Sequence, residues 1–185
     1  MMKKDLLAIA AVVLIVVVLM CGTKIQSVDD YYLEHIDDIT ADSPTVTVSV
    51  RCDTILDNWD SLDENLRSDK YVPRDGAIVA DYVIVLRKND TVYEILRRVT
   101  RHYKLTLDIV TLPEINSVYV KGINQLYEFS CGELSGWTFR VNGVVPSVDC
   151  ASYKLSNGDV VEWLYTCDLG RDLAVYDVYG GGQHD

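Results

Sequence analysis

One tryptophan is the residue of this sequence best suited to ligand chemistry. Trp137 follows Ser135 and Gly136 in "GELSGWTFRVNG", and the glycine allows the backbone to approach a ligand closely. An indole exposed at the junction of a loop and a strand can stack on a flat macrocycle or a sugar. Alternatively, Trp137 packs beneath a disulfide bridge as part of the core.

Other side chains that could join Trp137 lie close to it in sequence. Tyr127 and Phe129 alternate with Leu126 and Glu128, as expected of a strand with one face towards the core. Together with a polar group from the following turn they would form a binding platform. Its candidate members are Trp137, Tyr127, Phe129, Asn142 and Ser135.

Catalytic and metal-binding patterns are weak. Ser135 lies in "GELSG", which lacks the G-x-S-x-G spacing of a nucleophile elbow. His35, His102 and His184 are scattered without the spacing of zinc ligands. We therefore expect no enzyme activity and no metal site.

The charge and the N-terminus indicate where the chain acts. A net charge of -11 argues against a nucleic-acid partner. Residues 1–22 carry two lysines and an apolar run, Leu6 to Met20, which rises about 22 Å as a helix and fits a signal peptide or a membrane anchor. "VLMC" resembles a lipoprotein lipobox and makes Cys21 a candidate lipidation site, although Met20 departs from that pattern. The alternatives are a lipoprotein, an uncleaved signal anchor and ordinary secretion. All three predict an extracytoplasmic protein, and the first two predict attachment to the membrane by a lipid or by an anchor helix.

The remainder divides into a tether, one folded unit and a tail. Residues 23–44 are acidic and polar, and they predict a tether. Residues 45–172 carry the periodic apolar patterns of a single domain, and residues 173–185 predict a flexible tail.

The folded unit is predicted to consist of several strands around one helix. In "TVYEILRRVTRHY", apolar residues recur at helical spacing, and Thr91 with Glu94 matches a capping box. Asn142-Gly143 and Asn157-Gly158 are hairpin signals. Strand-like segments precede and follow the helix: "TVTVSVRC", "DYVIVLRK", "LTLDIV", "SVYVKGI", "QLYEFS", "WTFRVNG", "SYKL" and "DVVEWLYTC".

This order predicts an α+β fold, a β-grasp-like mixed sheet packed on one amphipathic helix, with an N-terminal signal or anchor helix before it. In such a fold the first and last strands lie parallel and adjacent. Apart from Cys21, an even number of cysteines predicts a disulfide framework in an exported protein. Of three possible connectivities, this topology favours Cys52 with Cys167 and Cys131 with Cys150.

The run from "SGW" and "VNG" to "SYKLSNGDVVEWLYTC", with "VSVRCDTILDN" and "NDTVYEIL" upstream, resembles the transcobalamin-like C-terminal domain of exported Gram-positive bacterial proteins. In transcobalamin and intrinsic factor a similar small domain closes over cobalamin. The resemblance implies a non-enzymatic binding module for cobalamin or a related corrinoid, working with an envelope protein or an uptake system. The alternative is an interaction or structural domain that meets another protein or a cell-wall polymer without a small ligand.

Overall fold

The computed structural model describes residues 39–40, 42–115 and 117–173. The chain divides into two compact units, Met1–His35 and Ile36–Asp185, and the described residues all belong to the second. The predicted signal or anchor segment, the lipidation site Cys21, most of the tether and nearly all of the tail lie outside the described residues. Within the described ranges, no helix is both long and apolar enough to span a membrane.

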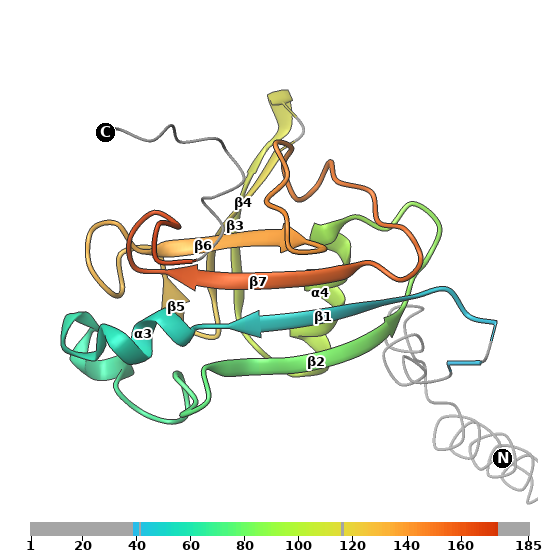
Figure 1. The fold of residues 1–185 in the computed structure, drawn as a ribbon. Coiled ribbons are helices and arrows are strands. Elements are labelled where there is room, and N and C mark those ends of the chain that lie inside the picture. Colours follow the sequence, from blue (N-terminus) through green and yellow to red (C-terminus); the bar gives the residue numbers. More distant parts are fainter. Residues whose placement is uncertain (1–38, 41, 116, 174–185) are drawn as a thin grey trace, which may run out of the picture. The chain divides into compact units, whose positions relative to one another are not determined.

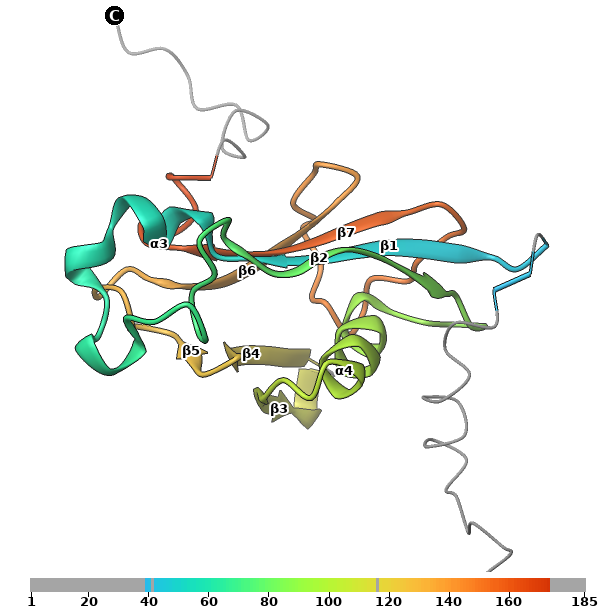
Figure 2. The same cartoon turned by 90° about the horizontal axis from the view of Figure 1, so that it is seen from below.

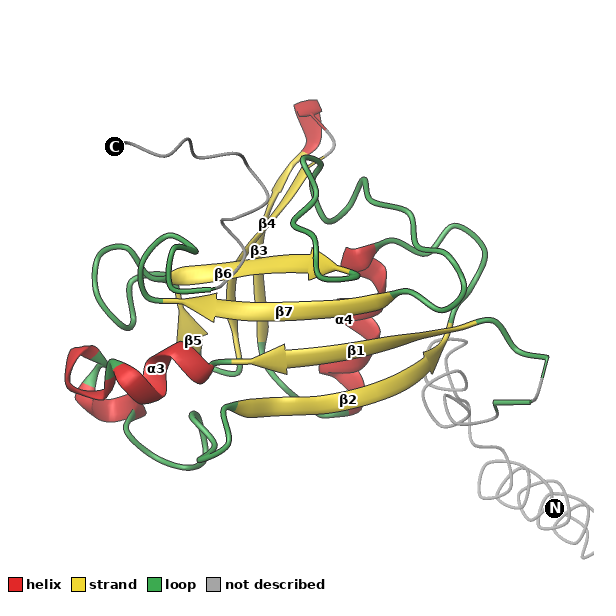
Figure 3. Ribbon diagram, viewed as in Figure 1, coloured by secondary structure: helices red, strands yellow, loops and turns green. Residues whose placement is uncertain are grey.

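The second unit is a mixed α+β fold with two sheets (Figure 1, Figure 3). One sheet has the strand order β2-β1-β7-β6, and the other has the order β3-β4-β5. The strands are β1 (Thr45–Arg51), β2 (Ala77–Val85), β3 (Leu107–Leu112), β4 (Ser117–Ile123), β5 (Leu126–Tyr127), β6 (Gly136–Val141) and β7 (Val160–Thr166). The strands are thus divided between two sheets instead of forming one curled sheet.

The first and last strands pair in parallel at the centre of the four-stranded sheet, as the sequence predicted. Their register runs from Thr47 beside Val160 to Arg51 beside Leu164. The outer pairs, β1 with β2 and β6 with β7, are antiparallel. Because β7 lies between β1 and β6, it pairs both with the first strand of the domain and with the strand that carries Trp137.

Helix α4 (Val92–His102) covers one face of the four-stranded sheet, on the same side as β3 and β4 (Figure 2). The predicted N-cap is confirmed, since the Thr91 hydroxyl accepts a hydrogen bond from the Glu94 amide at 3.3 Å. The Glu94 side chain pairs with Arg97. The helix buries its apolar stripe against β1 and β7, including Ile95 and Leu96.

The segment after β1 contains short helices that the periodicity did not indicate. They are α3 (Asp53–Asp57), η1 (Trp59–Ser61) and η2 (Glu64–Leu66), and η3 (Pro113–Ile115) lies between β3 and β4. Conversely, the predicted strand 152–155 contributes one isolated bridge, between Thr91 and Lys154. Asn142 and Gly143 both have positive φ in a tight turn between Val141 and Val144, as the Asn-Gly signal predicted.

Two apolar clusters support the fold. The larger lies between the four-stranded sheet and α4 and includes Val48, Leu96 and Trp163. The smaller lies under α3 and includes Leu62, Tyr165 and three of the four described cysteines, Cys52, Cys131 and Cys167. Trp137 packs against both clusters.

Candidate functional site

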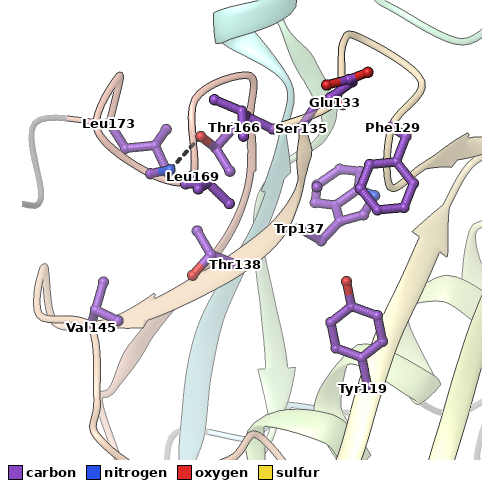
Figure 4. A pocket seen from close by; sticks show the side chains of 13 residues that line it. Tyr119, Phe129, Glu133, Ser135, Trp137, Thr138, Val145, Thr166, Leu169 and Leu173 are labelled. Carbon is purple, nitrogen blue, oxygen red and sulfur yellow. Dashed lines mark hydrogen bonds between the residues drawn. The ribbon is translucent and has the colours of Figure 1, made fainter.

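A cavity of about 630 Å³ lies at the β6 end of the four-stranded sheet. It is open to solvent and lies between two segments, the loop 128–135 that leads into β6 and the turn 167–173 that follows β7 (Figure 4). Its walls are mostly apolar, and the size falls within the roughly 300–1,000 Å³ of small-molecule sites. The lining residues include Tyr119, Phe129, Leu134, Trp137, Thr138 and Leu169.

Two apolar side chains on this cavity are held in an unfavourable backbone conformation. Phe129 has a φ of 69° and is 62% exposed, and Leu169 has a φ of 49° and is 59% exposed. A non-glycine residue in the left-handed region costs about 1–3 kcal/mol and tends to occur at ligand-binding sites. Neither side chain offsets this cost through burial. The backbone conformation is held instead by hydrogen bonds from the Phe129 amide to the Ser135 carbonyl at 3.0 Å and from the Leu169 amide to the Leu134 carbonyl at 2.9 Å.

Trp137 lies at the junction of the cavity and the core. Its Nε1 donates a hydrogen bond to the Leu126 carbonyl at 2.8 Å, and its ring meets Tyr165 edge-on with centroids 5.2 Å apart. The half-buried indole therefore has one part fixed by the core and another part in the cavity wall. The packing of Trp137 against the core is thus observed, and its role as a ligand platform stays a prediction.

Ser135 contributes to the cavity by shaping the loop rather than by presenting its hydroxyl. Its Oγ accepts hydrogen bonds from the Cys131 amide at 3.0 Å and from the Tyr165 hydroxyl at 3.0 Å, and donates to the Gly132 carbonyl at 2.8 Å. The side chain is buried, and its hydrogen-bonding capacity is used within the loop. Burial also raises the pKa of the Tyr165 hydroxyl above its usual value.

The opposite wall is fixed by a compact turn. The Thr166 hydroxyl donates to the Asp172 carboxylate and accepts from the Gly170 amide at 2.6 Å (Figure 4). Asp172 also accepts from the Cys167 amide at 2.7 Å. The Leu169 amide donates to the Leu134 carbonyl at 2.9 Å, and this hydrogen bond links the turn directly to the loop across the cavity.

The third side of the cavity carries a polar rim. The Tyr119 hydroxyl donates to the Glu128 carboxylate at 2.6 Å, which raises the pKa of Tyr119 to about 12. Lys121 lies 3.6 Å from the other Glu128 oxygen. Tyr119 therefore remains protonated near neutral pH, with its ring fixed beside the opening.

The structure brings together three of the five predicted platform residues. Trp137, Phe129 and Ser135 line the cavity, whereas Tyr127 and Asn142 are not part of its lining. The Tyr127 ring packs over Gly122, where an added Cβ would lie 2.4 Å from the ring. The Asn142 side chain stabilises the turn instead. Its Nδ2 donates a hydrogen bond to the Asp159 carboxylate, and its Oδ1 accepts one from the Val160 amide.

Sequence reasoning did not identify the residues on the far side of the cavity. Leu169 and Leu134 lie in segments without apolar periodicity, and Tyr119 lies on a different sheet from Trp137. The only local signal was a glycine after Leu169 in "DLGRD", which is typical of a turn.

One of the two predicted cysteine pairs is divided between the two clusters. Cys131 and Cys150 lie in different clusters, whereas Cys52 and Cys167 both pack in the smaller one. The structure contains Cys52, Cys131, Cys150 and Cys167 as thiols. Cys150 packs in the larger cluster and donates to the Val118 carbonyl at 3.3 Å, whereas Cys131 packs in the smaller one beside Cys167. Cys52 donates to the Gly76 carbonyl at 3.5 Å. Burial raises the pKa values of Cys52 and Cys150 to about 12.

Metal-ligating residues are not clustered in the part of the chain that the structure describes. Among those residues, no group of three or more His, Cys, Asp or Glu side chains is arranged to hold a metal ion. His102, one of the three histidines considered above, stacks on Tyr82 with ring centroids 5.2 Å apart.

A family model matches a part of the chain that includes some of the cavity residues. Residues 86–166 match the model of a family described as a domain of unknown function (DUF4430), a transcobalamin-like family. No curated protein shows a significant match. Among solved structures, the chain is similar to a candidate metal binding protein from Ruminococcus gnavus ATCC 29149, at 12% identity and a TM-score of 0.39, with 66% of this chain and 95% of that chain covered. The family match begins after β2 and contains α4, Phe129, Trp137 and the whole of β7, whereas Leu169 lies outside it.

Proposed function

We propose that this chain is a non-enzymatic binding module for a flat, largely apolar small ligand, with a corrinoid such as cobalamin or a precursor as the first class to test. The conformation of Phe129 and Leu169 is the observation that carries this proposal. Two large apolar side chains lie in water on strained backbone at opposite sides of one cavity. A bound ligand would cover them and offset the strain.

The chemistry of the walls favours a neutral or cationic ligand with a planar apolar face. Tyr119, Phe129 and Trp137 provide aromatic surface, and Glu133 is the charged residue of the lining. An acidic protein with an acidic group at the cavity repels anions. The transcobalamin-like character of residues 86–166 supports testing corrinoids before other planar compounds.

We further propose that the module is exported and stays attached to the membrane through residues 1–22, by lipid on Cys21 or as an anchor helix. The apolar run 6–20 supports this, and the acidic remainder would have little affinity for an anionic lipid surface. At that location the module would deliver its ligand to an uptake system or to another envelope protein.

The first experiment is a titration of the full chain, purified in detergent micelles, with cobalamin and cobinamide. Tryptophan fluorescence and corrinoid absorbance report binding. We expect saturation at micromolar concentration or below, and a loss of about tenfold or more in Phe129→Gly because apolar contact area is removed. Tyr103→Ala, which removes an exposed aromatic ring outside the cavity, is the matched control and should bind normally. Absence of binding up to about millimolar ligand would contradict the corrinoid proposal.

A second function is favoured by the position of β6. Among the described strands, β6 ends the four-stranded sheet, and an edge strand can pair with an extended segment of another protein. Capture of a protein from cell envelope that is lost when residues 142–149 are scrambled, together with no corrinoid binding, would favour an interaction domain without a small ligand. Capture that survives scrambling would count against the hairpin as the contact.

A further inference from the structure

The two segments that border the cavity also meet behind it, through their cysteines. Cys131 belongs to the loop 128–135, and Cys167 begins the turn 167–173. The two side chains are close enough for each to shift the pKa of the other. Both pack in the cluster under α3, so the same two segments are in contact at the cavity and at this thiol pair.

Helix α3 holds the two sulfur atoms over one of its turns. The Cys131 Sγ lies 3.5 Å from the Asn58 carbonyl oxygen, and the Cys167 Sγ lies 3.6 Å from the Thr54 hydroxyl. Thr54 and Asn58 are themselves joined, since the Asn58 Nδ2 donates to the Thr54 carbonyl at 2.8 Å. The α3 turn thus restricts where either sulfur can move.

The backbones of both cysteines are fixed as well. The Cys131 amide donates to the Ser135 hydroxyl at 3.0 Å, and the Cys167 amide donates to the Asp172 carboxylate at 2.7 Å. Two thiols held against the same helical turn on fixed backbones need little rearrangement to form a bridge. Cys150 lies in the other cluster. Cys52 shares the cluster of the pair, but it is fully buried with its Sγ 3.5 Å from the Gly76 carbonyl oxygen.

We propose that Cys131 and Cys167 form a reversible disulfide that joins the two walls of the cavity, while Cys52 and Cys150 remain thiols. This inference does not depend on the identity of the ligand. It replaces the pairs that strand topology alone favoured, because the loop carrying Cys131 folds back under α3 instead of along the hairpin that leads to Cys150.

The reaction partner is a low-molecular-weight disulfide. The thiolate of Cys167 attacks one sulfur of that disulfide and releases one thiolate; Cys131 then attacks the Cys167 sulfur and releases the second. Two electrons pass from the protein to the oxidant, and the two protons end on the two released thiols. The accessibilities agree with these roles, since Cys167 is partly exposed and Cys131 is buried. The interaction between the two thiols lowers the pKa of Cys167 and raises that of Cys131.

The test equilibrates the full chain in detergent micelles with mixtures of oxidised and reduced glutathione. Free thiols are then alkylated, and peptides are mapped by mass spectrometry without reduction. We expect a Cys131–Cys167 peptide that disappears as the reduced fraction rises, with Cys52 and Cys150 alkylated only after denaturation. A dominant bridge that includes Cys52 or Cys150, or no bridge under fully oxidising conditions, would overturn the proposal.

Matched variants separate this bridge from general effects of cysteine substitution. Oxidation should raise the Tm by about 5–10 °C in the native chain. Cys131→Ala and Cys167→Ala should abolish this shift, whereas Cys150→Ala and Cys52→Ala should retain it, each relative to its own reduced form. Retention of the shift in Cys131→Ala would contradict the assignment, and the peptide map of the native chain decides the result if a variant fails to fold.

Discussion

The layer between the four-stranded sheet and α4 differs sharply from the region around the cavity. Under α4, apolar residues such as Ile95 and Leu96 are fully buried on regular backbone. At the cavity, Phe129 and Leu169 are exposed on left-handed backbone. The first region follows the rule that local conformation and burial agree, and the second departs from it. Departures of this kind are expected at functional or strained sites.

Polar groups show the same contrast. In the layer under α4, Arg98 donates to the Asp90 carboxylate and to the Val85 carbonyl at 2.9 Å, and both members of the ion pair have side chains only 10% exposed. Burial lowers the pKa of Arg98 from its usual value. At the cavity, the pair of Lys121 with Glu128 lies on the rim. Loss of the buried pair between Arg98 and Asp90 should therefore lower the free energy of unfolding strongly. Loss of the partly exposed pair between Lys121 and Glu128 should change it little.

The largest effect is expected from Asp90→Ala. Removing one member of a buried ion pair leaves Arg98 charged without its partner and should lower the free energy of unfolding by about 3–5 kcal/mol. Asp69→Ala is the matched control, because Asp69 and Arg74 form an exposed pair worth at most about 1 kcal/mol. Urea denaturation monitored by circular dichroism measures both. Equal losses of unfolding free energy in the two variants would show that the buried Asp90 pair contributes no more to stability than the exposed pair.

Leu96→Ala tests the packing of the same layer. The side chain is fully buried, so its truncation should cost about 2–5 kcal/mol. Leu112→Ala on β3 removes the same atoms from a side chain that is 43% exposed, and should change stability by no more than about 0.5 kcal/mol. A small effect of Leu96→Ala in the same denaturation experiment would mean that α4 does not anchor the core.

Trp137→Phe sharpens the comparison where the two regions meet. The variant keeps an aromatic ring in the cavity wall but removes the hydrogen bond to the Leu126 carbonyl, so it should lose about 1 kcal/mol of stability. Corrinoid binding, where present, should weaken less than in Phe129→Gly. Thermal unfolding and the ligand titration measure the two effects separately, and unchanged stability would remove Trp137 from the core.

Phe129→Gly should have the smallest effect on stability and the opposite sign. Glycine adopts positive φ without strain, so the variant should be as stable as the native chain or more stable by up to about 1 kcal/mol. Val83→Gly on β2 is the control, because Val83 is similarly exposed on extended backbone and its replacement should cost about 1 kcal/mol. If both variants lose stability equally in urea denaturation, Phe129 is not strained.

Much of the regular structure could be predicted from the sequence. Alternating valines identified β1, the Thr91 cap and the apolar stripe identified α4, and the Asn142-Gly143 turn was placed correctly. These features depend on interactions between residues a few positions apart, which periodicity and turn chemistry report directly. The strand expected at residues 152–155 was wrong because strand formation also needs a neighbouring strand, and the described chain offers this segment only a single bridge.

For the candidate site, the sequence by itself determined that Trp137 and Phe129 would lie close to one another, because eight positions separate them in one loop and strand. Only the tertiary structure decided that Leu169 and Tyr119 complete the cavity, that Tyr127 and Asn142 do not line it, and that Cys131 lies beside Cys167. The physical reason is that these outcomes depend on how β7 returns between β1 and β6. Contacts between distant segments leave no periodic trace in the sequence of either one.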